Sequence, residues 1–292
     1  MPSDESRFTV DSACIDCDQC RQIAPATFAA SGGRTAVRRQ PAGREETRLA
    51  ALALVTCPTG AIHAAPGARS AVRQAAASLP EAVTPDGSVL FCGYAAESSF
   101  GASSYLIRRP EGNVLVDSPR FAAPLVRRLE ALGGVTLMVL THRDDVADHA
   151  KFAAHFRCPR VLHRDDVTRA TREVERQPSG DDPVPLAPDL LFVPTPGHTR
   201  GHAVLLHAER HLFSGDHLAF DPDAGALVAW RDVCWWDWEA QIRSLARLLD
   251  LRFEWLLPGH GHRHHAPAAQ MRRELAALVD GLRSQPCHGG RC

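Results

Sequence analysis

The chain has 292 residues, and because domains usually contain about 100–200 residues, this length suggests two of them. Hydrophobic residues make up 45% and charged residues 23%, as in ordinary folded proteins, which excludes a disordered or fibrous chain. The formal net charge is −1, so no overall basic field is present to hold nucleic acid, and we expect no nucleic-acid partner.

No stretch approaches the ~20 apolar residues needed to cross a bilayer, so we expect no membrane partner. Residues 1–10 are polar and acidic and lack the apolar region of a signal peptide. We therefore expect a cytoplasmic protein, in which disulfides are rare. The nine cysteines then need another explanation, and so do the fifteen histidines, all but His63 of which lie at or beyond His142.

The first chemical motif along the chain is a group of four cysteines. Cys14, Cys17 and Cys20 have the spacing C-x2-C-x2-C, and Cys57-Pro58 follows 37 positions after Cys20. Three thiolates at this spacing can surround one cuboidal iron–sulfur cluster while a distant Cys-Pro supplies the fourth ligand. A tetrahedral zinc site is the alternative, although zinc motifs usually pair two C-x2-C units.

The residues around these cysteines, 20–28 and 57–62, are similar to those of a single-cluster bacterial ferredoxin, and the resemblance covers about residues 7–63. It implies one [4Fe–4S] cluster held by Cys14, Cys17, Cys20 and Cys57. Pro80, Pro85 and Gly87 break any helix that continues beyond about Ser70–Ala77, which indicates a linker there. The expected organisation is 1–66 for the ferredoxin domain, 67–87 for the linker, 88–285 for the second domain and 286–292 for the tail.

Beyond the linker, apolar runs alternate with helical patterns. Strands are expected at Val89–Cys92, Ser104–Ile107, Val114–Val116, Val135–Leu140, Arg160–His163, Leu190–Val193, Ala203–His207, His211–Phe213 and Trp255–Leu257. Helices are expected at Ala122–Leu132, Ala147–Phe156, Asp237–Leu249 and Pro267–Arg283. Strands mixed with helices in this way indicate a layered α/β domain.

Four segments of this second domain carry histidine and aspartate directly after an apolar run. They are His142-Arg-Asp144-Asp145-Val-Ala-Asp148-His149, Pro196-Gly-His198-Thr199, Ser214-Gly-Asp216-His217 and Leu257-Pro-Gly-His260. Imidazole and carboxylate ligands suit zinc, iron or manganese. A shared carboxylate such as Asp216 can hold two ions roughly 3.5–4 Å apart and so activate a water molecule.

The order, spacing and context of these four segments resemble the metallo-β-lactamase superfamily over about residues 88–285. The resemblance implies an α+β two-domain chain, with the small ferredoxin-like domain followed by an αββα metallo-β-lactamase sandwich. It also implies two divalent metal ions, zinc or iron, with manganese also compatible. The implied ligands are His142, Asp144 and His198 for one ion and Asp148, His149 and His260 for the other, with Asp216 bridging.

The first of these motifs departs from the family pattern. The family's H-x-H-x-D-H is replaced here by H-x-D-D-x-x-D-H, so Asp144 stands in the place of a histidine and two residues are inserted. The insertion leaves open whether Asp144 or Asp145 is the ligand, and it makes Asp148 a candidate catalytic base. An added carboxylate makes the donor set harder, which favours iron or manganese over zinc. Flavodiiron proteins of the same superfamily also carry an acid at this place, without the insertion and with a flavin module.

Other residues near these motifs have simpler explanations beside a functional one. His202 is a candidate catalytic or substrate-contact residue, and His217 is expected near the metals. The segment His163-Arg-Asp165-Asp166-Val167 repeats the His142 segment, and it is either a ligand site or a strand end where an aspartate caps the next helix. Trp235 and Trp236 are expected either to wall a pocket or to lie in the core. The remaining cysteines are expected to pack as small apolar residues (Cys92, Cys158, Cys234) or to lie in the tail (Cys287, Cys292).

Three functions compete at this point. The family resemblance favours a hydrolase in which a metal-activated hydroxide attacks an ester, thioester or lactone of a small molecule. The fused ferredoxin domain and Asp144 favour a di-iron oxidoreductase that receives electrons from the cluster, and through it from an external electron donor. A non-enzymatic iron–sulfur sensor is the third interpretation, and the nearly full ligand set argues against it.

Overall fold

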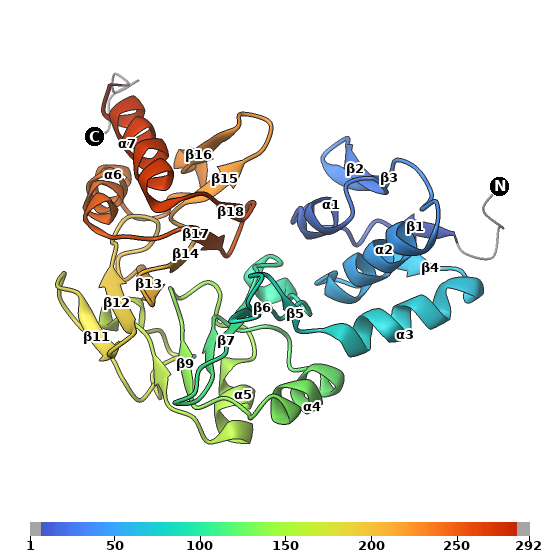
Figure 1. The fold of residues 1–292 in the computed structure, drawn as a ribbon, viewed down its shortest axis with the longest axis horizontal. Coiled ribbons are helices and arrows are strands. Elements are labelled where there is room, and N and C mark those ends of the chain that lie inside the picture. The colour runs from blue at the N-terminus through green and yellow to red at the C-terminus, as the bar shows by residue number, and fades with distance from the viewer. Residues whose placement is uncertain (1–6, 285–292) are drawn as a thin grey trace. The chain divides into compact units, whose positions relative to one another are not determined.

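The computed structural model describes residues 7–284, so the expected tail with Cys287 and Cys292 lies outside the described residues. Both of its compact units mix helices and strands, which confirms the expected fold class (Figure 1). The first unit contains the chain through Met138 together with Val146–Cys158, and the second contains Val139–Asp145 together with the chain from Pro159 onward. Among the described residues, no helix combines the length and the apolar character that crossing a bilayer requires.

The cysteine-rich part of the first unit is built from short elements. They are β1 (Phe8–Val10), α1 (Gln19–Ile23), β2 (Phe28–Ser31), β3 (Arg34–Val37), α2 (Arg44–Thr56) and β4 (Ile62–Ala64). β1 pairs with β4 in antiparallel fashion, with Val10 opposite Ile62. This pairing draws the chain before Cys14 and the chain after Cys57 together. The four cysteines are therefore gathered by sheet pairing, although 37 positions separate the third from the fourth.

The rest of the first unit continues directly from this part. Its elements are η2 (Pro66–Ala68), α3 (Arg69–Ser78), β5 (Glu81–Ala82), β6 (Val89–Phe91), η3 (Glu97–Ser99), β7 (Tyr105–Ile107), β8 (Val114–Val116), α4 (Ala123–Ala131), β9 (Leu137–Val139) and α5 (His149–Phe156). Neighbouring strands follow the order β9-β8-β7-β6-β5. Leu90, Leu106 and Leu115 stand opposite one another across β6, β7 and β8, and all three are buried. The apolar runs expected to be strands are strands because their side chains fill this core.

The expected linker is part of the packed first unit. The short helix expected at Ser70–Ala77 is α3, and β5 follows it. Arg48 of α2 forms an ion pair with Glu81 of β5, with 2.9 Å between Nη1 and Oε1. The Ala95 backbone N–H donates to the Thr56 carbonyl at 3.2 Å. The cysteine-rich part and the first strands after it therefore pack as one unit.

The second unit is built on a six-stranded sheet. Its elements are β10 (Arg160–Val161), η4 (Arg164–Asp166), β11 (Val184–Ala187), β12 (Leu190–Pro194), β13 (Ala203–His207), β14 (His211–Gly215), β15 (Ala219–Asp221), β16 (Ala226–Val228), η5 (Arg231–Val233), α6 (Trp238–Arg247), η6 (Leu248–Asp250), β17 (Trp255–Pro258), β18 (His264–His265) and α7 (Ala268–Ser284). The strand order in the sheet is β11-β12-β13-β14-β17-β18. Only the β14–β17 pair is parallel, and the other four pairs are antiparallel.

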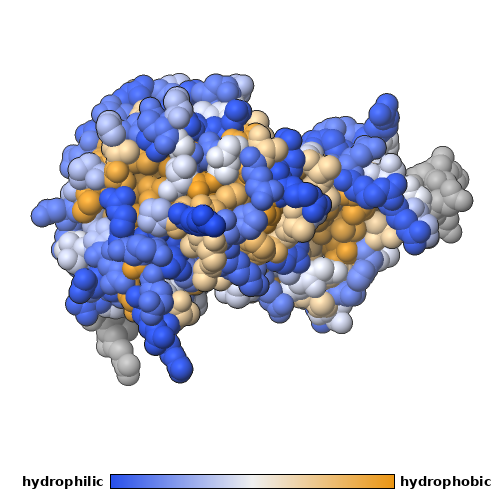
Figure 2. Space-filling view, turned by 90° about the horizontal axis from the view of Figure 1, so that it is seen from below, coloured by the Kyte–Doolittle hydropathy of each residue, from blue (hydrophilic) through white to orange (hydrophobic). Residues whose placement is uncertain are grey.

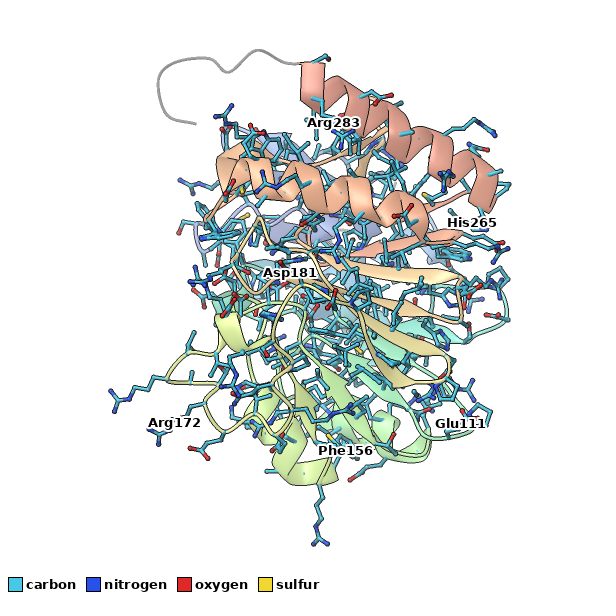
Figure 3. All side chains as sticks on the ribbon, turned by 90° about the vertical axis from the view of Figure 1, so that its left-hand side faces the viewer. Glu111, Phe156, Arg172, Asp181, His265 and Arg283 are labelled. Atoms are coloured by element: carbon cyan, nitrogen blue, oxygen red, sulfur yellow. The ribbon has the colours of Figure 1, made fainter. Side chains whose placement is uncertain are left out.

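Helices α6 and α7 lie side by side against this sheet (Figure 3). Their apolar faces, which include Leu245 of α6 and Leu275 of α7, join Val204, Leu212 and Leu256 of the strands in one buried cluster. Burial of this apolar surface is the main stabilising term for such a layer. On the face shown in Figure 2, hydrophilic residues predominate and hydrophobic ones reach the surface between them, as is normal for a folded chain.

The parallel β14–β17 pair positions the candidate site. Gly215 at the end of β14 stands beside Pro258 at the end of β17. The Gly259 backbone N–H donates to the Gly215 carbonyl at 2.8 Å. Because parallel strands end at the same edge of a sheet, Asp216 and His260 leave the sheet next to each other.

Candidate metal sites

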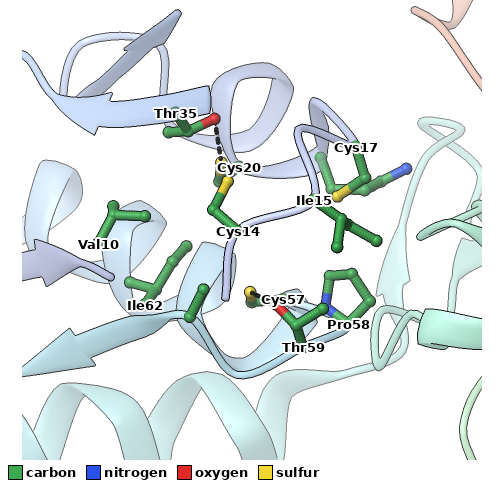
Figure 4. Close-up of a pocket in the computed structure, with 12 residues that line it drawn as sticks. Val10, Cys14, Ile15, Cys17, Cys20, Thr35, Cys57, Pro58, Thr59 and Ile62 are labelled. Atoms are coloured by element: carbon green, nitrogen blue, oxygen red, sulfur yellow. Dashed lines mark hydrogen bonds between the residues drawn. The ribbon is translucent and has the colours of Figure 1, made fainter. Parts of the chain in front are cut away.

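Four of the cysteines of the first unit, Cys14, Cys17, Cys20 and Cys57, line one pocket (Figure 4). Cys20 and Cys57 are buried, while Cys14 and Cys17 are partly exposed. Apolar side chains, Val10, Ile15 and Ile62 among them, complete the lining. The pocket is thus a thiol-lined, largely apolar enclosure, as an iron–sulfur cluster requires.

The electrostatics of these cysteines fit a cationic group. Burial raises the pKa of Cys17 to about 12 and also raises the pKa of Cys20, because the thiolate loses its hydration. The Cys20 thiol lies 3.4 Å from the Thr35 hydroxyl. Buried thiols of this kind become thiolates when a metal replaces their protons, so the residues present fit a [4Fe–4S] cluster.

A glycine outside the cysteine motif touches this site. Gly101 has a φ of +83°, and a Cβ added to it would lie 2.8 Å from both Cβ and Sγ of Cys17 and 3.3 Å from Cγ of Pro58. Nearby, the buried Gln19 amide donates to the Ser103 hydroxyl at 2.9 Å. The segment 95–103 therefore covers the Cys17 side of the cluster pocket. No sequence pattern singles out Gly101, because only the tertiary contact makes its missing side chain matter.

The variant Gly101→Ala is expected to lower the cluster content, because its Cβ would displace the Cys17 thiol. Gly60→Ala is a matched control, since Gly60 has a φ of +70° and no atom lies within 4 Å of an added Cβ. Both variants should lose about 1 kcal/mol through backbone strain, but only Gly101→Ala should lose iron and sulfide. Iron and sulfide content per chain would check this, and equal contents in the two variants would contradict it.

The second site is a group of three histidines and three aspartates, all in the second unit. Asp216 is central, since its Oδ2 lies 3.6 Å from Nε2 of His142, 3.6 Å from Nε2 of His198 and 3.8 Å from Nε2 of His260. Asp144 Oδ2 lies 3.7 Å from His198 Nε2, and Asp145 Oδ1 lies 3.9 Å from His260 Nε2.

These ligand atoms fall into two groups. His142, Asp144 and His198 form one group of convergent ligand atoms, and His142, Asp145 and Asp216 form another. Asp144 and Asp145, the two alternatives left open by the sequence, therefore each belong to one group of convergent ligand atoms. We call these six residues the His/Asp cluster.

The His/Asp cluster fits metal ions on two observations. Its N···O distances of 3.6–3.9 Å exceed hydrogen-bond lengths and suit donors that flank a common ion. Both ring nitrogens of His198 and Oδ1 of Asp216 are buried without a hydrogen-bond partner within the described chain. Buried polar atoms are normally satisfied, so a bound cation accounts for them.

Small residues allow the close approach of these ligands. A Cβ at Gly259 would lie 2.8 Å from Oδ2 of Asp145 and 2.8 Å from Oδ1 of Asp216. Gly215, with a φ of +51°, would place a Cβ 2.7 Å from Nε2 of His202. The two glycines that precede Asp216 and His260 in sequence are therefore needed because a side chain at either would collide with the site.

Asp166 holds the two ligand loops at a fixed spacing. Its buried carboxylate accepts from the Arg143 N–H at 3.0 Å, the Thr199 hydroxyl at 2.6 Å and the Gly201 N–H at 2.7 Å. It is not a metal ligand in either group of convergent atoms. Nor is it the cap expected for the next helix, since at η4 the His163 ring accepts from the Asp165 N–H. Asp166 thus ties the loop of His142 to the loop of His198.

The charges at the His/Asp cluster favour cations. Burial opposes ionisation of Asp216, but the neighbouring imidazoles, His260 first and then His142, outweigh it and lower its pKa. Burial lowers the pKa of His202 well below its usual value and that of His217 to about 3. Asp216 is therefore ionised, and the two histidines behind it are neutral.

Asp148 and His149, expected as ligands, belong to neither group of convergent atoms. Asp148 accepts from the Phe121 N–H at 2.8 Å and pairs with Lys151 at 2.8 Å, and His149 is buried in the first turn of α5. The inserted residues explain this, because the chain turns at Ala147, with a φ of 29°, before α5 begins. Asp148 and His149 belong to the first unit, whereas Asp145 belongs to the second unit with the other convergent residues.

His202, expected as a catalytic residue, is fully buried with both ring nitrogens engaged. Its Nδ1 lies 2.9 Å from the Thr195 hydroxyl, and its Nε2 accepts from the Asp216 N–H at 3.3 Å. His217 stacks on it, with 5.2 Å between ring centroids. His202 therefore positions the backbone of Asp216 from behind the cluster.

Comparisons with known proteins agree with the two sites. The family model described as "Metallo-beta-lactamase superfamily" matches residues 99–260, and that described as "4Fe-4S single cluster domain of Ferredoxin I" matches residues 10–64. No curated protein matches the chain.

Three solved structures are among those similar to this chain. TTHA1623 in a di-iron-bound form is 27% identical, with 56% of this chain and 89% of that chain covered and a TM-score of 0.44. ST1585 from Sulfolobus tokodaii, an archaeal metallo-beta-lactamase superfamily protein, is 16% identical, with coverages of 65% and 84% and a TM-score of 0.45. ETHE1 from Myxococcus xanthus is 21% identical, with coverages of 68% and 92% and a TM-score of 0.45.

Proposed function

The chain belongs to the metallo-beta-lactamase superfamily and carries a fused 4Fe-4S domain, and on this premise we propose that it is a dinuclear metal oxidoreductase. In this proposal the His/Asp cluster would hold two iron ions and the cysteine pocket would hold a [4Fe–4S] cluster, which would supply single electrons for reduction of a bound small-molecule substrate. The observation that carries the proposal is the convergence of three carboxylates, Asp144, Asp145 and Asp216, on the histidines of the cluster.

The charge of the donor set supports redox metals. Three carboxylates and three neutral imidazoles give three negative charges, so two divalent ions would leave about one net positive charge at the centre. Anionic oxygen donors neutralise the ions and so weaken their effect on the pKa of a bound water. The same hard donors suit iron or manganese better than zinc.

Each residue of the His/Asp cluster has a defined place in this proposal. Asp216 would be shared by both ions because its Oδ2 lies within 3.8 Å of all three histidines. His142, Asp144 and His198 would complete one ion's ligands, and Asp145 and His260 the other's. When bound, the ions would supply one-electron steps and polarise a small-molecule substrate. Asp166 and His202 keep the ligands in position through the hydrogen bonds described above.

The fused domain supplies the second line of support. Cys14, Cys17, Cys20 and Cys57 line one thiol pocket, and a [4Fe–4S] cluster in it transfers single electrons. An external one-electron donor protein would reduce this cluster. The partners proposed are therefore this donor and a small-molecule substrate.

Hydrolysis of an ester, thioester or lactone is the second candidate, and the shared carboxylate of Asp216 favours it. Such a carboxylate can hold two ions at the spacing that activates a water molecule. Water would add to the carbonyl carbon, and the products would be a carboxylic acid and an alcohol or a thiol. This reaction needs no electrons, so it leaves the four cysteines without a role in turnover.

Metal analysis of the anaerobically purified chain separates the two candidates. The oxidoreductase predicts about six iron ions per chain, four from the cluster and two from the His/Asp cluster, with both spectroscopic signals changing on dithionite addition. Two zinc ions and about four irons, with turnover of a thioester by the oxidised protein, would overturn it. The variant Cys57→Ala should abolish electron delivery, while Cys92→Ala, at a buried cysteine outside the pocket, should not.

A further inference from the structure

One short loop of the second unit gathers exposed aromatic side chains. Five large hydrophobic residues are exposed in the described chain, and four of them lie in the segment Trp230–Trp236, which we call the aromatic loop. Their exposed fractions are 38% for Trp230, 39% for Val233, 60% for Trp235 and 47% for Trp236. Single exposed hydrophobic residues are ordinary, but a contiguous group of them marks a binding surface.

One end of the aromatic loop is fixed to the loop of the metal ligand His198. The Trp235 N–H donates to the His198 carbonyl at 2.9 Å, and the Asp237 N–H donates to the Gly197 carbonyl at 3.1 Å. The Cys234 thiol also donates to the Gly197 carbonyl, at 3.2 Å. The Trp235 ring stands 6.2 Å from the His198 ring, centroid to centroid. The exposed indole of Trp235 is therefore held beside His198 of the His/Asp cluster.

The other end of the aromatic loop reaches the second metal position. A Cβ added to Gly261, the residue after His260, would lie 2.7 Å from Cη2 of Trp230. The Trp230 ring thus packs on the segment that carries His260. Between its two ends, the loop runs from the flank of His198 to the flank of His260.

The chemistry of the aromatic loop indicates that the part of the ligand it contacts is a flat, uncharged ring. Its only charged residues are Arg231 and Asp232, whose charges cancel, so the loop offers no net charge to a ligand. Indole rings bind other rings by stacking and by edge contacts. A stable protein interface needs about 20–30 residues a side, many more than this loop presents, which favours a small molecule.

We propose that the aromatic loop is the substrate-binding wall of the His/Asp cluster, and that it binds an aromatic ring next to the reacting group. The proposal deepens the proposed function and rests on it for the statement that the ligand is a substrate. Trp235 and Trp236 would contact the ring directly, and the reacting group would then face the His/Asp cluster beside His198.

Binding of 2-naphthoate and of acetate to the metal-loaded full chain tests this without turnover. The two probes share a carboxylate, and only naphthoate has rings. Calorimetry should show naphthoate binding at least about 10-fold more tightly than acetate, and Trp235→Ala should remove about 10-fold of this preference. Trp235→Phe should keep most of it. Phe100→Ala is the matched control, because Phe100 is the one other exposed large hydrophobic residue of the described chain.

The outcomes separate this proposal from the proposed function. Equal binding of the two probes, or an unchanged preference in Trp235→Ala with its metal content intact, would overturn the aromatic wall whatever the reaction is. A preference lost in Trp235→Ala and Trp236→Ala, in a chain that holds zinc and hydrolyses thioesters, would support the wall while overturning the redox function. Since both indoles are largely exposed, neither variant is expected to disturb folding.

Discussion

Replacing Asp216 by asparagine is expected to empty both metal positions and to lower kcat/KM by at least about a thousandfold. The expectation follows from its central place, since its Oδ2 lies 3.6–3.8 Å from Nε2 of His142, His198 and His260. An amide removes the negative charge that two cations would share. Metal content per chain and steady-state kinetics would measure the effect.

Asp223→Asn is the matched control for this change. Asp223 is exposed in the turn between β15 and β16, seven positions after Asp216, and belongs to neither group of convergent ligand atoms. The control should keep both ions and full activity. Two ions per chain in Asp216→Asn would show that the shared carboxylate is assigned to the wrong residue.

The second large effect is expected at Asp145, and Asp148 provides its control within the same motif. Asp145→Asn should lose one of the two ions, because Asp145 converges with His142 and Asp216 and is 1% exposed. Asp148→Asn should keep both ions and lose about 1 kcal/mol of stability, through its bond to the Phe121 N–H and its ion pair with Lys151. Metal content and thermal unfolding of both variants would check this.

The reverse pattern, with metal lost in Asp148→Asn and kept in Asp145→Asn, would restore the ligand set expected from the sequence. The comparison is sharp because both aspartates belong to one short segment and undergo the same chemical change. It also bears on function, since Asp145 is the third carboxylate on which the redox proposal depends.

Much of the fold follows from local pattern alone. The run Val89–Cys92 predicts β6, found at Val89–Phe91, and Pro267–Arg283 predicts α7, found at Ala268–Ser284. These elements are long or fully apolar, so periodicity identifies them. The short elements α1, β11 and β18 and the hairpin β15–β16 were not predicted. They have too few residues to show a period, and their neighbours in space determine their conformation.

The sequence by itself determined the chemistry of both sites. Cys14, Cys17, Cys20 and Cys57 share one pocket, and His142, His198, Asp216 and His260 converge, because strand ends and sheet pairing bring motif residues together in a way that spacing already indicates. Asp144 and Asp216 were also expected from the sequence, and only the tertiary structure brings Asp145 together with His142 and Asp216. Ala147, with a φ of 29°, lies between Asp145 and Asp148.

The same division holds for the residues that support the sites. Gly101 and Asp166 lie 84 and 23 positions from the residues they serve, Cys17 and Arg143. Gly101 matters because a side chain there would collide with Cys17. Asp166 matters because its carboxylate accepts three hydrogen bonds from two loops. Neither property belongs to a local pattern. The sequence indicates the type of ligand because each metal selects particular donor atoms. The distances between the ligands and the hydrogen bonds that support them depend on contacts between distant segments.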